Sequence, residues 1–183
     1  FTDDLRQFFS ESGGVERMSA LLLGAAVLAW FWSRGLRQAL AGWHVPAACA
    51  LMMMRELDFD KRFTAQGVLK LRYYTEPGPL LDKLPGVLVI LVILAVVVTF
   101  IRRDLGPWLA RLGRIDGTAW LLAVALVIAA IAKSVDGIDR KLAPFGIEVP
   151  PLVLTRAGRI EELLELAFAL MLLQVIALTR RRG

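Results

Sequence analysis

The sequence has little of the chemistry from which catalytic and metal centres are usually built. It contains a single cysteine, Cys49, and a single histidine, His44. One cysteine excludes an intrachain disulfide framework and a metal site made only of cysteines, and one histidine excludes a haem held by two histidines of this chain. No Gly-x-Ser-x-Gly, His-Glu-x-x-His or phosphate-binding glycine motif is present. Catalysis is therefore the least supported class of function, and no cofactor is predicted.

Concentrated charge of one sign is also missing. Lys and Arg number 22 and Asp and Glu 17, which gives a formal net charge of +5. The basic residues are spread along the chain and interleaved with acidic ones, and no basic stripe carries base-stacking aromatics. Nucleic acid is therefore not an expected partner.

Apolar residues, by contrast, are abundant. The chain is 57% hydrophobic and 21% charged, with a mean hydropathy of +0.59, whereas an ordinary soluble domain is about half apolar and about a quarter charged. Five stretches contain no Asp, Glu, Lys or Arg: residues 18–33, 38–54, 84–101, 117–132 and 166–179. This pattern predicts an all-α, polytopic integral membrane helical bundle with about five transmembrane helices, in the inner (plasma) membrane of a bacterium.

The uncharged stretches are short for membrane spans. Each lies at or below the roughly 17 to 25 residues that a spanning helix needs, so the helices must continue into their charged flanks, which then lie at or just inside the membrane interface. A soluble bundle with buried core helices is the alternative. Residues 84–101, LPGVLVILVILAVVVTFI, argue against it, because they show no polar face.

The expected spans are about 15–32, 36–63, 84–101, 118–142 and 157–179, within one transmembrane domain over 15–183. Residues 1–14 are predicted to form a short amphipathic helix in the membrane interface, because Leu5, Phe8 and Phe9 share one face. Pro46 is expected to kink the second span near its middle, since proline removes a backbone donor. A short surface helix is expected in the basic connection that follows the third span.

Orientation is predicted from the density of basic residues, which favours the cytoplasmic side of short connections. In a five-span arrangement three dense basic groups fall on one side: Arg34 and Arg37; Arg102, Arg103, Arg111 and Arg114; and Arg180, Arg181 and Arg182. We therefore expect the C-terminus in the cytoplasm and the N-terminus outside.

Three charged segments are predicted to meet at the opposite, non-cytoplasmic face: the end of the second span, the end of the fourth and the start of the fifth. Together these segments, 55–62, 133–141 and 156–165, carry no net charge. The candidate functional residues are Arg55, Glu56, Asp58, Asp60, Lys61, Arg62, Lys133, Asp136, Asp139, Arg140, Glu161, Glu162 and Glu165.

Helical spacing adds detail to this prediction. Lys133, Asp136 and Arg140 would form one stripe on a continuous helix, and Asp58 with Arg62 would form a favourable i, i+4 pair. In contrast, two like-charged i, i+4 pairs would repel within their own helices. These are Glu56 with Asp60 and Glu161 with Glu165. Such pairs favour cations from other helices, or a bound ion, beside them.

Two interpretations of the charged segments remain open. The favoured one is ion pairing between helices, because unpaired charges at membrane depth are costly. The other is a binding site, either for a divalent cation (Mg, Ca or Mn) or for a phospholipid phosphate held by Arg55, Lys133 and Arg140. The candidate metal ligands are Glu56, Asp60, Asp136, Glu161 and Glu165.

As a function, the sequence favours a non-catalytic accessory or assembly subunit of a membrane complex. Its expected partners are membrane lipids and either other membrane subunits or further copies of itself. The alternative is a membrane-embedded lipid- or ion-binding site, or an enzyme, that uses the cluster of carboxylates, Lys and Arg.

Overall fold

The computed structural model describes residues 14–59, 71–75 and 79–180, and these form helices and short turns with no strand. The predicted interfacial segment 1–14 therefore lies almost entirely outside the described residues. The helices are α2 (Gly14–Ala41), α3 (His44–Glu56), α5 (Leu71–Thr75), α6 (Leu80–Arg103), α7 (Leu105–Gly113), α8 (Gly117–Val135), α9 (Ile138–Leu142), the 3₁₀ turn η1 (Ala143–Phe145) and α10 (Pro151–Arg180).

Four of these helices are long and apolar enough to cross a membrane. They are α2, α6, α8 and α10, and the most apolar window lies in α6, with a mean hydropathy of 3.1. The predicted all-α fold with several membrane-spanning helices is therefore confirmed. The short helix α7 occupies the connection in which a surface helix was expected.

The predicted second span, 36–63, is wrong as a single helix. Residues 36–41 are the last turns of α2 beyond an irregular point at Gly35 (φ 68°, ψ 161°), and α3 begins only at His44. At 13 residues, α3 is about 20 Å long, less than the roughly 30 Å of a bilayer core. The described residues thus contain four helices of full spanning length instead of five.

The turn between α2 and α3 is built around Trp30. Its indole Nε1 donates to the carbonyl of Ala39 (3.1 Å), and the Arg34 guanidinium lies 3.6 Å from the ring centroid. A Cβ at Gly42 would come within 2.6 Å of the same ring, so only glycine fits there. Pro46 lies in the first turn of α3, where backbone N–H groups have no helical acceptor, and the predicted mid-span kink is therefore absent.

The later spans also differ from their predicted limits. The fourth was expected over 118–142, but α8 ends at Val135 because Gly137 adopts a left-handed conformation (φ 58°) and α9 starts afresh. The fifth was expected over 157–179, but α10 already begins at Pro151, which fits the first turn of a helix. The third, 84–101, lies inside α6.

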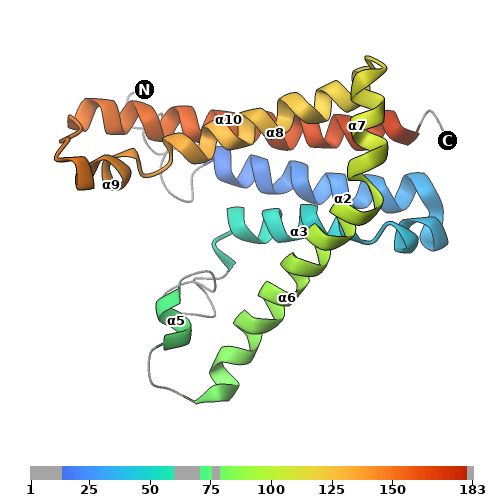
Figure 1. Ribbon diagram of the computed structural model, residues 1–183, viewed down its shortest axis with the longest axis horizontal. Coiled ribbons are helices and arrows are strands. Elements are labelled where there is room, and N and C mark those ends of the chain that lie inside the picture. The colour runs from blue at the N-terminus through green and yellow to red at the C-terminus, as the bar shows by residue number, and fades with distance from the viewer. Residues whose placement is uncertain (1–13, 60–70, 76–78, 181–183) are drawn as a thin grey trace.

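The helices α2, α8 and α10 lie side by side and form the main body of the bundle, with α3 packed on α2 (Figure 1). Seven of the twelve buried apolar residues in the described chain are alanines, which we call the alanine seam. The seam consists of Ala20, Ala26, Ala39, Ala119, Ala125, Ala132 and Ala169. Small side chains let helix backbones approach closely, which drives packing in a membrane, where lipid is as apolar as leucine.

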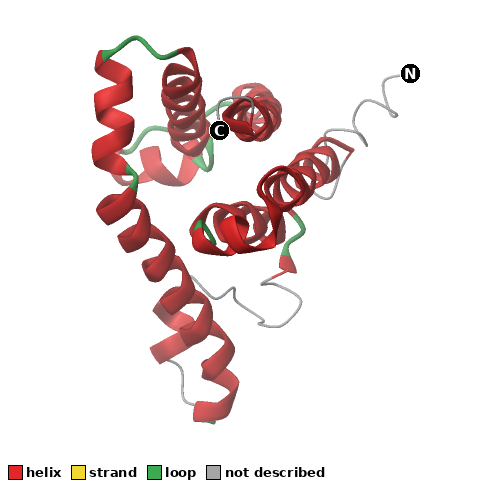
Figure 2. Ribbon diagram, turned by 90° about the vertical axis from the view of Figure 1, so that its right-hand side faces the viewer, coloured by secondary structure: helices red, strands yellow, loops and turns green. Residues whose placement is uncertain are grey.

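Helix α6 runs away from the other long helices (Figure 2). Only 6% of its most apolar window is buried, against 33% for α2. Its principal neighbours in the described chain are α3 and the adjoining α7. The joint with α3 is polar: His44 Nε2 lies 2.5 Å from Asp104 Oδ2, and Arg103 donates to the carbonyl of Ala41 (2.7 Å).

Candidate functional site

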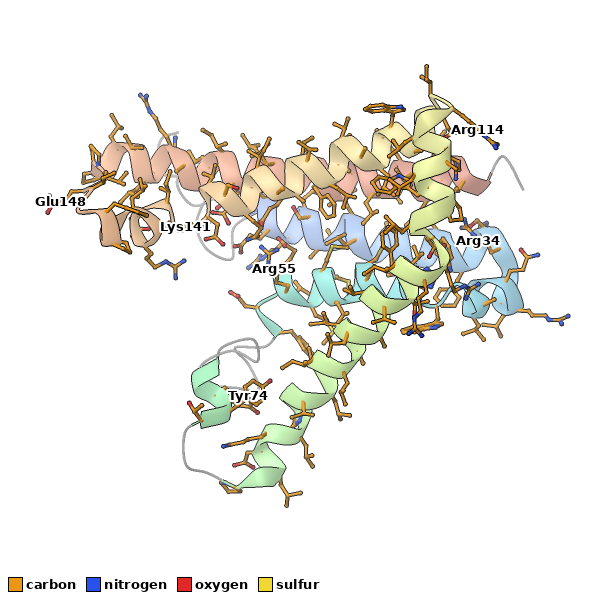
Figure 3. All side chains as sticks on the ribbon, in the orientation of Figure 1. Arg34, Arg55, Tyr74, Arg114, Lys141 and Glu148 are labelled. Atoms are coloured by element: carbon orange, nitrogen blue, oxygen red, sulfur yellow. The ribbon has the colours of Figure 1, made fainter. Side chains whose placement is uncertain are left out.

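Charged side chains from three helices meet at one end of the bundle. Arg55 and Glu56 come from the last turn of α3, Lys133 from the last turn of α8, and Asp136 from the turn after it. Glu161 and Glu165 come from α10. We call these six residues the charge cluster. Figure 3 labels Arg55 near the middle of the view, with Lys141 and Glu148 to its left and Arg34 and Arg114 to its right.

Glu165 is the carboxylate on which the three helices converge. Its Oε1 lies 2.5 Å from Arg55 Nη2 and 3.1 Å from Lys133 Nζ, and its side chain is only 14% exposed. The first contact joins α10 to α3, and the second joins α10 to α8. One carboxylate therefore links three helices that are far apart in sequence.

Lys133 is shared more widely than any other cation of the cluster. Besides Glu165 it contacts Asp136 (3.1 Å) and Glu161 (3.5 Å). Arg140 approaches Asp136 from the far side, at 3.8 Å. Lys133, Asp136 and Arg140 thus meet as predicted, but across a chain reversal at Gly137 and not along one continuous helix.

Asp136 lies outside the spanning helices and is partly exposed. Burial alone would raise the pKa of Asp136, but the hydrogen bond from Lys133 and the charges of Lys133, Lys141 and Arg140 outweigh it. The pKa of Asp136 is therefore held below its usual value, and its carboxylate is the favoured form.

Glu56 is the most deeply buried carboxylate of the cluster. Its side chain is 7% exposed, and its one observed ion pair is a 3.7 Å contact with Arg55, whose guanidinium also makes the shorter contact with Glu165. Four carboxylates of the charge cluster therefore share two cations, Arg55 and Lys133.

The remaining candidates lie outside the charge cluster. Asp58 ends α3 with a positive φ of 49°, so the helix on which an Asp58–Arg62 pair was predicted stops before it. Asp139 is exposed on α9. Glu162 of α10 has a buried Oε2 that receives no hydrogen bond in the described chain. Asp60, Lys61 and Arg62 lie outside the described residues.

Lys141 is a contributor that the sequence reasoning missed. Its Nζ donates to the carbonyls of Lys133 (2.5 Å) and Ser134 (3.4 Å), the last turn of α8, where carbonyls have no helical donor. This contact requires the chain to turn back at Gly137. Gly137 was the available signal, since a glycine that follows a basic residue at the end of an apolar run favours a helix stop, and Lys133 is that basic residue.

The observed contacts within the charge cluster are ion pairs. In the part of the chain that the structure describes, no three His, Cys, Asp or Glu side chains are arranged to hold a metal ion. The proposed ligand Asp60 lies outside that part. The ammonium of Lys133 and the guanidinium of Arg55 lie against the carboxylates that could otherwise act as ligands.

The chain matches no protein-family model, no curated protein and no solved structure.

Proposed function

We propose that the protein is a non-catalytic subunit of a membrane complex and that α6 is the helix that docks against a partner. The observation that carries this proposal is the contrast between composition and packing in α6. It is the most apolar of the four spanning helices and also the least buried.

Lipid alone can solvate such a helix, so exposure by itself would not argue for a partner. The direction of α6 is the second support. It meets α3 at the His44–Asp104 joint and then diverges (Figure 2). Large apolar side chains, including Leu88, Leu91 and Leu94, therefore remain exposed over a broad face of the helix. A helix that leaves its own bundle at a fixed polar joint presents a surface that a neighbouring helix can cover.

The charge cluster has a structural role in this proposal. A charged side chain near the membrane centre costs about 2.5 to 3.5 kcal/mol on insertion scales, and pairing lowers that cost. Glu165 with Arg55 and Lys133 fixes α3, α8 and α10 relative to one another at the non-cytoplasmic face. A fixed bundle is a suitable base from which α6 can project. The opposite, arginine-rich end faces the cytoplasm, and the membrane is the inner membrane of a bacterium.

Photo-crosslinking in the native membrane tests the docking role of α6. A photo-reactive residue replaces Leu91 of α6, which is 55% exposed, and in a matched control it replaces Val127 of α8, which is 57% exposed. We expect a protein adduct of defined mass from position 91 and only lipid adducts from position 127. Lipid adducts alone from both positions would contradict the proposal.

A second candidate function is an ion- or lipid-binding site at the charge cluster. It is favoured by the burial of Glu56, whose side chain is 7% exposed and whose one observed ion pair is a 3.7 Å contact with Arg55, because an added cation could pair with this carboxylate. The protein purified in mild detergent is examined by native mass spectrometry with Mg²⁺, Ca²⁺ or Mn²⁺ added singly. A bound ion or retained phospholipid that Glu56→Gln removes, in a protein that stays folded, would support this candidate over a purely structural cluster.

A further inference from the structure

All five tryptophans of the chain lie at the end of the molecule opposite the charge cluster. Trp30 and Trp32 are near the end of α2, Trp43 is in the turn before α3, Trp108 is in α7, and Trp120 is in the first turn of α8. Tryptophan settles at the level of lipid headgroups, because its ring is apolar and its N–H is polar. The exposed members of this group, Trp32, Trp43 and Trp120, therefore mark one membrane interface.

The same end is strongly basic. Its arginines are Arg34, Arg37, Arg102, Arg103, Arg111 and Arg114, and its only acidic residues among 30–45 and 100–120 are Asp104 and Asp116. Both acids are engaged inside the protein. Asp104 contacts His44, and Asp116 caps α8 by accepting from the backbone N–H groups of residues 118 and 119 and from Arg111 (3.0 Å).

Three of these arginines have no ion-pair partner in the part of the chain that the structure describes. Arg37, Arg102 and Arg114 are exposed, and no carboxylate within the described ranges pairs with them. By contrast, Arg34 lies on the Trp30 ring and Arg103 donates to the carbonyl of Ala41. The three exposed guanidiniums therefore have their hydrogen-bonding capacity available to another molecule.

Helix α7 holds part of this surface in place. It runs across the start of α8 and not along it (Figure 1). Two indole hydrogen bonds fix it to α8, from Trp108 Nε1 to the carbonyl of Ala119 (3.1 Å) and from Trp120 Nε1 to the carbonyl of Leu112 (3.2 Å). Arg114 directly follows α7, two residues beyond the Leu112 carbonyl that accepts from Trp120, and Leu109 of α7 is an exposed apolar residue.

We infer that this arginine- and tryptophan-rich end is a docking surface for the phosphate groups of anionic phospholipids. The planar guanidinium matches a phosphate with paired hydrogen bonds, and the tryptophans set the arginines at the depth at which lipid phosphates lie. A basic residue near an anionic membrane surface is worth about a fivefold gain in association. A soluble polyanion would gain nothing from the exposed indoles of Trp32, Trp43 and Trp120.

Because every tryptophan lies at this end, intrinsic fluorescence reports which lipids surround it. The full chain is reconstituted in phosphatidylcholine vesicles that contain, at equal mole fraction, either dibrominated phosphatidylglycerol or dibrominated phosphatidylcholine. We expect stronger quenching by phosphatidylglycerol. We define the selectivity as the ratio of quenching by the two lipids. The double variant Arg37→Gln/Arg114→Gln removes two contributions of about fivefold each, so this ratio should fall toward one, by at most roughly 30-fold.

The matched control is Arg17→Gln/Arg156→Gln, which removes two exposed arginines from the charge-cluster end and should leave the selectivity unchanged. Three results would overturn the inference: equal quenching of the native protein by both lipids, unchanged selectivity in Arg37→Gln/Arg114→Gln, or an equal loss in the control. Equal quenching by both lipids, together with a change in fluorescence when a soluble polyanion such as polyglutamate is added, would overturn the inference in favour of a soluble acidic partner.

Discussion

Helices α10 and α6 are both long and apolar, yet they behave differently. Helix α10 packs between α2 and α8, and its Ala169 is fully buried. Helix α6 is more apolar but has one alanine and one glycine between residues 84 and 101, and it is almost unburied. In a membrane, close packing between helices depends on small residues and shared polar contacts more than on hydropathy. Helix α10 thus packs against helices of its own chain, whereas most of the surface of α6 is left for lipid or a partner to cover.

The largest effect is expected from Glu165→Gln, which removes the group that holds both Arg55 and Lys133. Breaking a fully buried pair costs about 3 to 5 kcal/mol. Because Arg55 and Lys133 are about half exposed, water can solvate the charges left behind. We therefore expect a smaller loss, of about 2 to 3 kcal/mol, in the free energy of unfolding, measured by denaturant titration in mixed micelles. The control Glu56→Gln removes only a 3.7 Å contact, and we expect it to cost under about 1 kcal/mol. Equal losses would mean that Glu165 is not the joining residue.

Ala169→Leu should cost about 1 to 3 kcal/mol, because added methylene groups do not fit a close helix contact. The matched change on α6 is Ala95→Leu, which adds the same group to a helix with little burial. We expect it to leave the free energy of unfolding of the isolated protein nearly unchanged in the same titration. A comparable loss at both positions would remove the distinction between the two helices.

Gly137→Ala tests the chain reversal that brings Arg140 to the cluster. Its φ of 58° is unfavourable for residues with a Cβ, and an added Cβ would lie 2.5 Å from an Arg140 nitrogen. We expect a loss of about 1 to 2 kcal/mol. Gly106→Ala, at a helical glycine with open space around it, is the control and should be neutral or slightly stabilising. A neutral Gly137→Ala would mean that α8 and α9 can join into the continuous helix first predicted.

The smallest effect concerns Asp136 and pH. Because its folded pKa is lowered, Asp136 contributes stability above its unfolded pKa of about 3.9, and this contribution is lost as pH falls through the lower folded pKa. The difference in stability between the native protein and Asp136→Asn should therefore be constant from pH 8 to pH 5 and shrink below about pH 4. A difference that grows on acidification would contradict the assigned contact with Lys133.

Composition and uncharged runs were enough to predict the all-α class with several spanning helices, although five spans were predicted and four described helices reach spanning length. Helix limits were less predictable, because Gly35, Gly42 and Gly137 interrupt runs that look continuous in hydropathy. Whether a glycine ends a helix depends on tertiary contacts, such as the Trp30 ring against residue 42. The meeting of Arg55, Lys133 and Glu165 was predictable in outline, because topology brings their helix ends to one face.

Other contacts had no sequence signal. His44 and Asp104 are 60 residues apart and give no local pattern, so the joint that directs α6 could not be predicted. The divergence of α6 could not be predicted either, because the hydropathy of an apolar run does not depend on whether lipid, its own bundle or a partner surrounds it. The gathering of all five tryptophans at one end required only the order of the spans, and this order was largely predictable.

We propose that α6 docks against a partner, whereas α2 and α8 pack against α10 of the same chain. Native mass spectrometry of the protein extracted in mild detergent from its own membrane tests it most directly, with Leu88→Ala/Leu91→Ala on α6 compared with Val127→Ala/Ile131→Ala on α8. The account predicts a stoichiometric protein partner that the α6 variant loses and the α8 variant keeps. Detection of the native chain with bound lipids but no protein partner would contradict it, as would a partner that only the α8 variant loses.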